Sequence, residues 1–239
     1  MCGRIVQVMP PDEVAKAMDA VLEPSLGPGS EWRPRWNLPP SELVLAVVPD
    51  GPERRVERAV WGLPGGPEGR PLFNARAETV DRLASFRGAF RTGRVIVPVD
   101  AFYEWENPEH LAALGRTTAP SGRRQPWAFL PTGGPLLALA AISVPSVTPD
   151  GERIRAVSLI TTAANAVVGA IHDRMPAMVF GDDLARWLDP GTPREELFPL
   201  LGPAPEVAVV ARRVSTAVSN ARNEGAGLLD EVEPEARLF

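Results

Sequence analysis

Cys2 is the residue with the most distinctive chemical potential, and it is the one cysteine in this chain of 239 residues. Removal of Met1, which the small Cys2 side chain permits, would leave an amine and a thiol on adjacent carbons. An α-amine has a pKa of about 7.7–8.0 and a free thiol about 8.5, so both are partly nucleophilic near neutral pH. The amine converts an aldehyde to an imine, and the thiol then closes a five-membered thiazolidine ring. A buried or incidental cysteine is the simpler interpretation of this residue alone.

Three further polar residues lie among apolar neighbours. Glu104 interrupts an aromatic segment, where a carboxylate is costly unless it is paired or functional; a solvent-facing position on an alternating strand is the alternative. His172 has the side chain best suited to proton transfer near neutral pH, although a satisfied core histidine fits equally well. Arg76 is explained most simply as a surface ion-pair partner. None of these signals is specific by itself.

Composition limits the class of protein. The length, 44% hydrophobic content and 23% charged content predict one globular domain over 2–239. One cysteine and two histidines argue against disulfides and structural zinc, and no metal or cofactor is expected. No apolar run reaches the ~18 residues of a membrane span, and the first residues lack a signal-peptide core. We therefore expect a cytoplasmic protein without a membrane partner.

Charge is distributed unevenly along the chain. The net charge of −5 argues mildly against nucleic acid as a partner. Residues 70–94, however, carry six arginines against two acids, a local excess of four positive charges. Residues 221–239 carry two arginines against five acids, a local excess of three negative charges. Because binding of nucleic acid depends on local patches of charge, the net charge does not exclude nucleic acid as a partner.

Many short apolar segments separated by loops predict the elements that must position these residues. We expect an α+β fold: a single domain with a β-sandwich or barrel-like core of short, mainly antiparallel strands and a few peripheral helices. Strands are predicted over 4–8, 43–48, 56–61, 94–99, 101–106, 127–130, 136–143, 154–162, 177–180 and 207–212. Helices are predicted over 12–22, 75–83 with a continuation over 86–90, 163–171, 182–188 and 194–201. Loops are predicted over 23–40 and 62–71, and a surface insertion over 107–124.

Eight sequence blocks occur in the order in which they are found in the SRAP family, named for SOS-response-associated peptidases. They are MCGR at 1–4, WNLPP at 36–40, WGL at 61–63, NARAET at 74–79, VP at 97–98 with FYEW at 102–105, TTAAN at 161–165, HDRMP at 172–176 and SNAR at 219–222. The chain therefore resembles this family over about 2–225, and the combination of blocks is far more specific than any one of them.

This resemblance implies a monomeric sensor that binds single-stranded DNA and forms a thiazolidine cross-link with an abasic site, shielding the lesion during the DNA damage response. By position, Cys2 is the nucleophile and Asn74 hydrogen-bonds it. Glu104 is the general base, and His172 donates a proton that helps to open the deoxyribose ring. The DNA-binding residues that it implies are Arg4, Arg76 and Arg174, which contact phosphates, with Thr161, Trp105 and Pro40.

The resemblance leaves two other functions open, and the sequence departs from the family pattern, notably in the loop after the WGL block at 61–63. The same residues could cleave the Met1–Cys2 bond or act as a cysteine-type peptidase on other peptides, and a host aminopeptidase could remove Met1 instead. A non-covalent module for single-stranded DNA is the third interpretation. Gly65 and Gly66 stand where the family commonly has DNA-wedging aromatic residues, which places the affinity for DNA in question.

Overall fold

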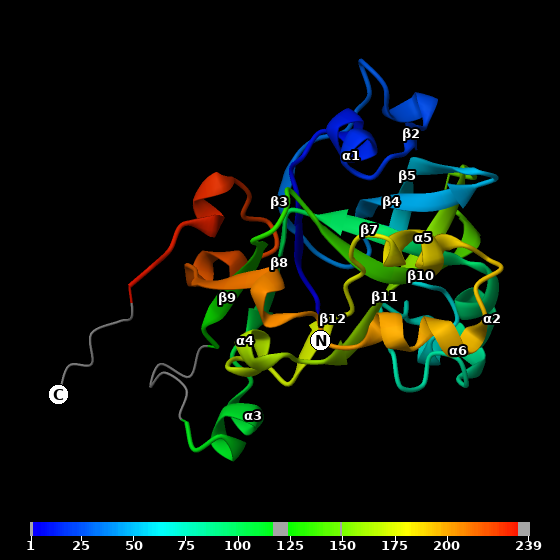
Figure 1. Ribbon diagram of the computed structural model, residues 1–239. Coiled ribbons are helices and arrows are strands. Elements are labelled where there is room, and N and C mark those ends of the chain that lie inside the picture. Colours follow the sequence, from blue (N-terminus) through cyan, green and yellow to red (C-terminus); the bar gives the residue numbers. More distant parts are fainter. Residues whose placement is uncertain (1, 117–123, 149, 234–239) are drawn as a thin grey trace.

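The fold is built from two sheets with short helices around them (Figure 1). The computed structural model describes residues 2–116, 124–148 and 150–233. In these residues the smaller sheet has five strands in the order β13 (Val209–Arg213), β9 (Pro126–Pro131), β8 (Ala101–Trp105), β1 (Ile5–Gln7) and β3 (Arg35–Leu38). All of its pairings are antiparallel.

The larger sheet has eight strands in the described residues. Its order is β12 (Arg174–Pro176), β11 (Arg153–Ala163), β10 (Leu137–Val147), β7 (Arg94–Val99), β4 (Leu43–Asp50), β5 (Glu53–Trp61) and β2 (Val21–Leu22), with β6 (Asn74–Arg76) paired to β11. Strand β11 also pairs in parallel with β5, so β11, β10, β7, β4 and β5 form a closed circuit. The predicted α+β fold with a barrel-like, mainly antiparallel core is confirmed.

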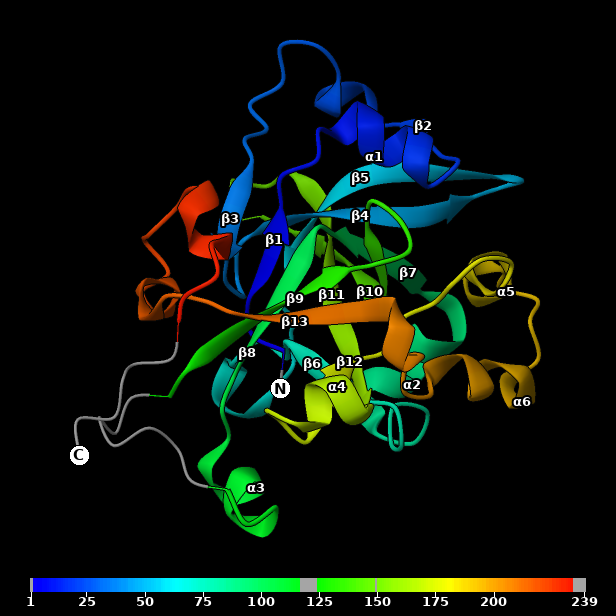
Figure 2. The ribbon, with the colours of Figure 1, turned by 60° about the vertical axis from the view of Figure 1, so that its left-hand side comes forward.

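The helices are short and peripheral. They are α1 (Pro11–Ala17), α2 (Ala84–Thr92), α3 (Pro108–Ala113), α4 (Ala166–Gly169), α5 (Asp183–Leu188) and α6 (Arg194–Leu197). In the part of the chain that the structure describes, none of them is long and apolar enough to span a membrane. A C-terminal segment with two 3₁₀ turns, Thr216–Ser219 and Ala226–Leu229, runs beside β3 and β9 (Figures 1 and 2).

Alternation along β8 divides the molecule into an inner and an outer apolar layer. Phe102 packs between the two sheets with Cys2, whereas Tyr103 and Trp105 pack on the outer face under the C-terminal segment. Since successive side chains of a strand point to opposite faces, Glu104 points inward beside Phe102. Glu104 and its sequence neighbour Trp105 therefore belong to different layers.

Buried Gln7 ties the two sheets together close to the start of the chain. Its side-chain Nε2 donates to the carbonyl oxygens of Leu45, at 3.1 Å, and Pro98, at 2.7 Å. Its Oε1 accepts the Leu45 backbone N–H at 2.9 Å. These bonds connect β1 to β4 and β7, and so fix the strand that follows Cys2.

Four secondary-structure predictions were wrong at least in part, and in three of them pairing with distant residues decides the structure. The predicted helix over 12–22 ends at Ala17, and residues 21–22 form β2, which pairs in parallel with β5. Residues 74–76 form β6 instead of the start of a helix over 75–83, because they pair with β11. The predicted loop over 23–40 contains β3, which pairs with β1. Residues 177–180 form only one isolated bridge, between Met178 and Leu139. Residues 117–123 of the predicted insertion lie outside the described residues.

Candidate active site

Cys2 lies directly before β1 and is completely buried. The following strand fixes its position, because Ile5 pairs with Leu38 of β3 on one side and Phe102 of β8 on the other. Asn74, the first residue of β6, donates from Nδ2 to the Cys2 carbonyl oxygen at 2.8 Å. The start of the chain is therefore held between the two sheets by backbone pairing and by one side-chain amide.

Glu104 supplies a carboxyl group to the same buried layer and is only 3% exposed. Burial raises the pKa of this carboxyl group to about 7, because the interior penalises its ionised form. Burial and the nearby charge of Glu104 also raise the pKa of the Cys2 thiol well above its ordinary value. Around neutral pH the carboxyl group is thus divided between its two protonation states, while the thiol keeps its proton.

His172 approaches Glu104 from the loop between α4 and β12. Its Nε2 lies 3.9 Å from Glu104 Oε2, and its Nδ1 accepts the Arg174 backbone N–H at 3.0 Å. Acceptance at Nδ1 assigns the neutral tautomer that carries its proton on Nε2. Burial lowers the pKa of His172 to about 4, so the ordinary value of ~6.5 does not describe this imidazole.

Three of the predicted DNA-binding residues come together on neighbouring strands. Thr161 of β11 pairs with Arg76 of β6 and with Pro176 of β12. Arg174 Nη2 donates to the Thr161 carbonyl oxygen at 2.6 Å. The same guanidinium forms a two-pronged ion pair with Glu78, at 2.5 and 3.0 Å. A phosphate that reaches Arg174 must therefore compete with the Glu78 carboxylate.

Arg4 belongs to a second group on the outer face of β8. Its Nη1 donates to Asn37 Oδ1 at 2.6 Å and to the Val218 carbonyl oxygen at 2.8 Å. The guanidinium lies 5.6 Å from the Trp105 ring centroid, a cation–π contact. Buried Asn37 holds this arrangement, because its Nδ2 also donates to the carbonyl oxygens of Val218, Asn220 and Asn223 at 3.0–3.1 Å.

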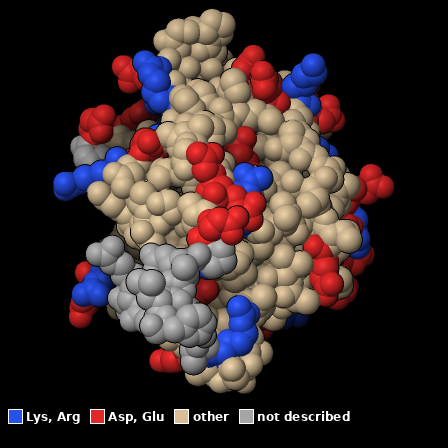
Figure 3. Space-filling model, turned by 90° about the vertical axis from the view of Figure 1, so that its left-hand side faces the viewer, with Lys and Arg blue, Asp and Glu red and all other residues tan. Residues whose placement is uncertain are grey.

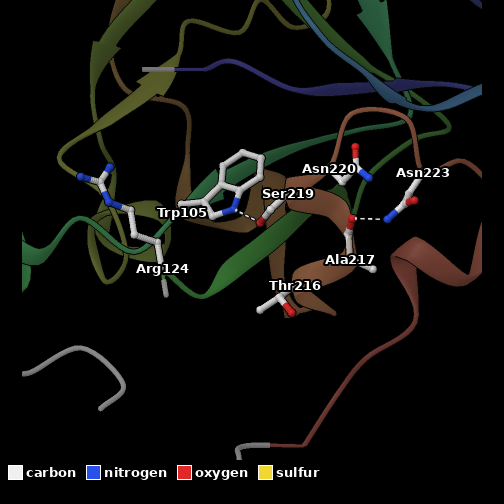
Figure 4. Close-up of a pocket in the computed structure, with 7 residues that line it drawn as sticks. All are labelled: Trp105, Arg124, Thr216, Ala217, Ser219, Asn220 and Asn223. Carbon is white, nitrogen blue, oxygen red and sulfur yellow. Dashed lines mark hydrogen bonds between the residues drawn. The ribbon is translucent and has the colours of Figure 1, made fainter. Parts of the chain in front are cut away.

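Trp105 forms a wall of a pocket of about 400 Å³ between the end of β8 and the C-terminal segment (Figure 4). The indole N–H donates to Ser219 Oγ at 3.0 Å, which fixes the ring. The residues that line the pocket are Trp105, Arg124, Thr216, Ala217, Ser219, Asn220 and Asn223. Sequence reasoning missed most of these residues and Asn37, although the blocks at 36–40 and 219–222 contain several of them. Pro40 lies outside this pocket, in the turn after β3.

The loop with Gly65 and Gly66 has a backbone that requires glycine. Gly65 has a φ of +94°, which side chains disfavour. A Cβ on Gly66 would lie 2.2 Å from the Arg70 carbonyl oxygen. Neither position therefore accepts an aromatic residue without refolding the loop.

Surface charge does not form one broad basic area on the face that carries β3 and the C-terminal segment. In the visible part of this face, acidic and basic side chains are interspersed, and acids gather at its centre (Figure 3). Among the described residues, no group of three or more His, Cys, Asp or Glu side chains could hold a metal ion.

Comparison with known proteins confirms the family that the sequence blocks indicate. The chain belongs to the SOS response associated peptidase (SRAP) family, whose sequence model matches residues 1–221. It is 31% identical over 236 residues to the Abasic site processing protein YoaM of Bacillus subtilis, covering 96% of this chain and 98% of that protein. It is 28% identical over 260 residues to the Abasic site processing protein HMCES of Xenopus tropicalis, covering 93% of this chain and 76% of that protein.

A solved structure supports the fold independently. A protein from Bacteroides thetaiotaomicron superposes with a TM-score of 0.79 at 18% identity, covering 97% of this chain and all of that one. At this identity the likeness concerns the arrangement of the sheets and not the chemistry of the site.

The buried carboxyl group predicts a specific dependence of stability on pH. The pKa of Glu104 is about 7 in the folded chain against an ordinary 4.5, so its stabilising contribution is complete below pH 4.5 and is lost as the pH rises through 7. Glu104→Gln has no such loss. From pH 5 to pH 8 the free energy of unfolding of Glu104→Gln should therefore rise by about 2.5 kcal/mol relative to wild type, as measured by urea denaturation.

Glu109→Gln provides the matched control, because Glu109 is an exposed carboxyl group on α3. Its difference from wild type should be the same at both pH values. An equal difference at both pH values for Glu104→Gln would show that the Glu104 carboxyl group keeps its ordinary pKa.

Proposed function

We propose that this chain processes abasic sites in single-stranded DNA by forming a thiazolidine between Cys2 and the lesion's open-chain aldehyde. The proposal rests chiefly on one observation: Asn74 holds the Cys2 backbone beside the buried Glu104 carboxyl group, which His172 approaches. The names of the relatives, abasic site processing proteins, favour the same substrate. Met1 must first be removed, because only a free α-amine can form an imine.

The proposed reaction joins the aldehyde and the aminothiol with loss of one water. The Cys2 amine attacks C1′ of the opened sugar, a proton moves from nitrogen to oxygen, and the hydroxyl leaves as water to give an imine. Cys2 Sγ then adds to the imine carbon, and the thiol proton moves to the nitrogen. The five-membered ring consists of C1′ of the sugar and the backbone nitrogen, Cα, Cβ and Sγ of Cys2. The reaction requires no oxidant or cofactor.

Glu104 is suited to carry protons in both directions. With a pKa of about 7, it accepts a proton from the Cys2 ammonium and can return it to the departing hydroxyl group. Asn74 Oδ1 is buried and accepts no hydrogen bond from the described residues, so it is available to orient the amine of Cys2. His172 Nε2 lies 3.9 Å from the Glu104 carboxyl group, and these two side chains together would transfer the protons.

The two arginine groups would hold the DNA strand on either side of the lesion. Arg76 and Arg174, with Thr161, lie on the β6–β11–β12 edge, and Arg4 lies on the outer face of β8 beside Trp105. Guanidinium forks match phosphate oxygens and provide affinity without sequence preference. An unpaired base next to the lesion would stack on Trp105 in the neighbouring pocket.

Removal of Met1 by the same site is a second candidate function. It is favoured by the burial of Cys2 and Glu104 together between the two sheets, where the carboxylate could serve as the base for the thiol. Peptidase activity on other peptides would be a wider form of this reaction, and turnover of a peptide library tests it.

The intact mass of the purified protein tests self-processing. Wild type should lack the mass of Met1, and Glu104→Gln should retain it, because the thiol then has no base. Glu109→Gln should be processed like wild type. Complete loss of Met1 from all three proteins would assign the removal to a host aminopeptidase.

The cross-link itself is tested with single-stranded DNA that carries one abasic site, on a denaturing gel. Wild type should give a stable shifted band, and Cys2→Ala should give none. Cys2→Ser keeps the amine but cannot form a thiazolidine, so its band should appear only after borohydride reduction of the imine. Equal binding of abasic and intact strands, without a wild-type band, would instead identify a non-covalent DNA-binding module.

Trp105 should contribute to DNA affinity more than to chemistry. In a Cys2→Ala background, Trp105→Ala should weaken binding of abasic single-stranded DNA by tenfold or more, since stacking contributes ~1–3 kcal/mol per base. With Cys2 present, the rate of cross-linking at saturating DNA should change little. Phe180→Ala, at an exposed aromatic residue outside the pocket, is the control. Unchanged affinity in Trp105→Ala would exclude the pocket from binding.

A further inference from the structure

Two groups compete for one nitrogen of His172. Nδ1 accepts the Arg174 backbone N–H at 3.0 Å, and Asp173 Oδ1 lies 3.2 Å from the same atom. The first contact suits a neutral imidazole with a lone pair on Nδ1. The second suits an imidazolium, whose Nδ1–H would be donated to the carboxylate. Asp173 is therefore placed to stabilise the protonated form of His172.

Asn107 orients the Asp173 carboxylate. Its Oδ1 accepts the backbone N–H groups of Glu109 and His110 at the start of α3, so its Nδ2 faces Asp173 Oδ1 at 3.3 Å. Because the amide oxygen caps the helix, the orientation of the amide is fixed. Asn107 also lies three residues after Glu104 on the same chain. The chain of contacts from Glu104 through His172 and Asp173 to Asn107 therefore begins and ends near the end of β8.

The α3 segment holds the loop that carries His172 through its backbone as well. The Asn107 N–H donates to the Ile171 carbonyl oxygen at 3.1 Å. The carbonyl oxygen of Gly169 lies 2.6 Å from His110 Nε2, and that of Ala170 accepts from Arg116 Nη1 at 2.5 Å. These carbonyls end the short helix α4, where no intrahelical partner is available. The segment 107–116 is thus bonded to the loop at every residue from 169 to 171.

We propose that Asp173, oriented by Asn107, is a positioning residue that lets His172 pass protons between solvent and the buried site. This inference rests on the proposed cross-linking function. A proton enters at Nδ1 beside Asp173, whose side chain is 54% exposed, and the Nε2 proton leaves toward the sugar oxygen. When Glu104 has taken a proton from the Cys2 ammonium and passes it to Nε2, the Nδ1 proton returns to solvent past Asp173. In each of these two transfers, His172 takes up one proton and releases one.

Besides burial, the positive amino terminus lowers the pKa of His172, and the other charged or titratable side chains around it come from three elements. Glu104 faces it from β8 and His110 from α3, while Asp173 precedes β12. Burial, the largest effect, lowers the pKa of the imidazole, and the negative charge of Asp173 opposes that effect. Loss of the Asp173 charge should therefore make His172 still harder to protonate.

The test uses two readouts on the Met1-free protein. NMR titration follows the imidazoles directly, and with only two histidines in the chain His110→Gln assigns both. In Asp173→Asn, His172 should titrate at a lower pH than in wild type. The rate of cross-linking at saturating abasic DNA should fall about tenfold, a part of what general acid–base catalysis supplies, without weaker DNA binding.

Asn107→Ser separates orientation from folding. Serine still caps α3 but cannot reach Asp173, so the rate should fall and His172 should again titrate at a lower pH. Glu109→Gln, on the same helix, should resemble wild type in both readouts. An unchanged His172 titration and a wild-type cross-linking rate in Asp173→Asn would overturn the inference. Absence of any cross-link in wild type would overturn the proposed function instead, and the titration would still decide whether Asp173 acts on His172.

Discussion

Glu104 projects into the layer between the two sheets, where a carboxylate has lost most of its hydration and ionisation is penalised. The surrounding structure places the groups with which this carboxyl group could exchange protons. Backbone pairing of β1 brings Cys2 into the same layer, Asn74 fixes the Cys2 carbonyl, and the loop before β12 delivers His172. In the proposed reaction, a single buried carboxyl group with a pKa near neutrality would serve as base and acid in turn.

In the proposed function, the alternation of β8 would separate the reaction from DNA binding. Glu104 points into the core, while Trp105, its neighbour, points to the outer face, where Arg4 and the Asn37 network arrange the C-terminal segment. One strand thus connects the reaction centre to the surface that would hold the DNA. A change on the outer face can alter affinity while the inner layer stays intact, and this separation makes the roles of the two layers experimentally distinct.

The sequence predicted the fold class and most of the strands, because apolar alternation is a local property. It failed at β6 and β3, where helical spacing or proline content pointed elsewhere and pairing with strands far along the chain decided the outcome. The candidate site residues were proposed from the order of the family blocks and not from spacing. The low pKa of His172 and the contact from Asn107 to Asp173 depend on burial and packing, which no local pattern contains.

Because β6 pairs with β11, the candidate site is completed only late in the synthesis of the chain. The nucleophile is synthesised first, whereas β11 and the loop with His172 emerge from the ribosome only after some 170 residues. An aminothiol exposed during that time would react with small aldehydes of metabolism. In the proposed reaction Met1 would serve as a protecting group in the sense of synthetic chemistry, and its removal after β11 has paired would uncover the reactive pair only inside a finished site.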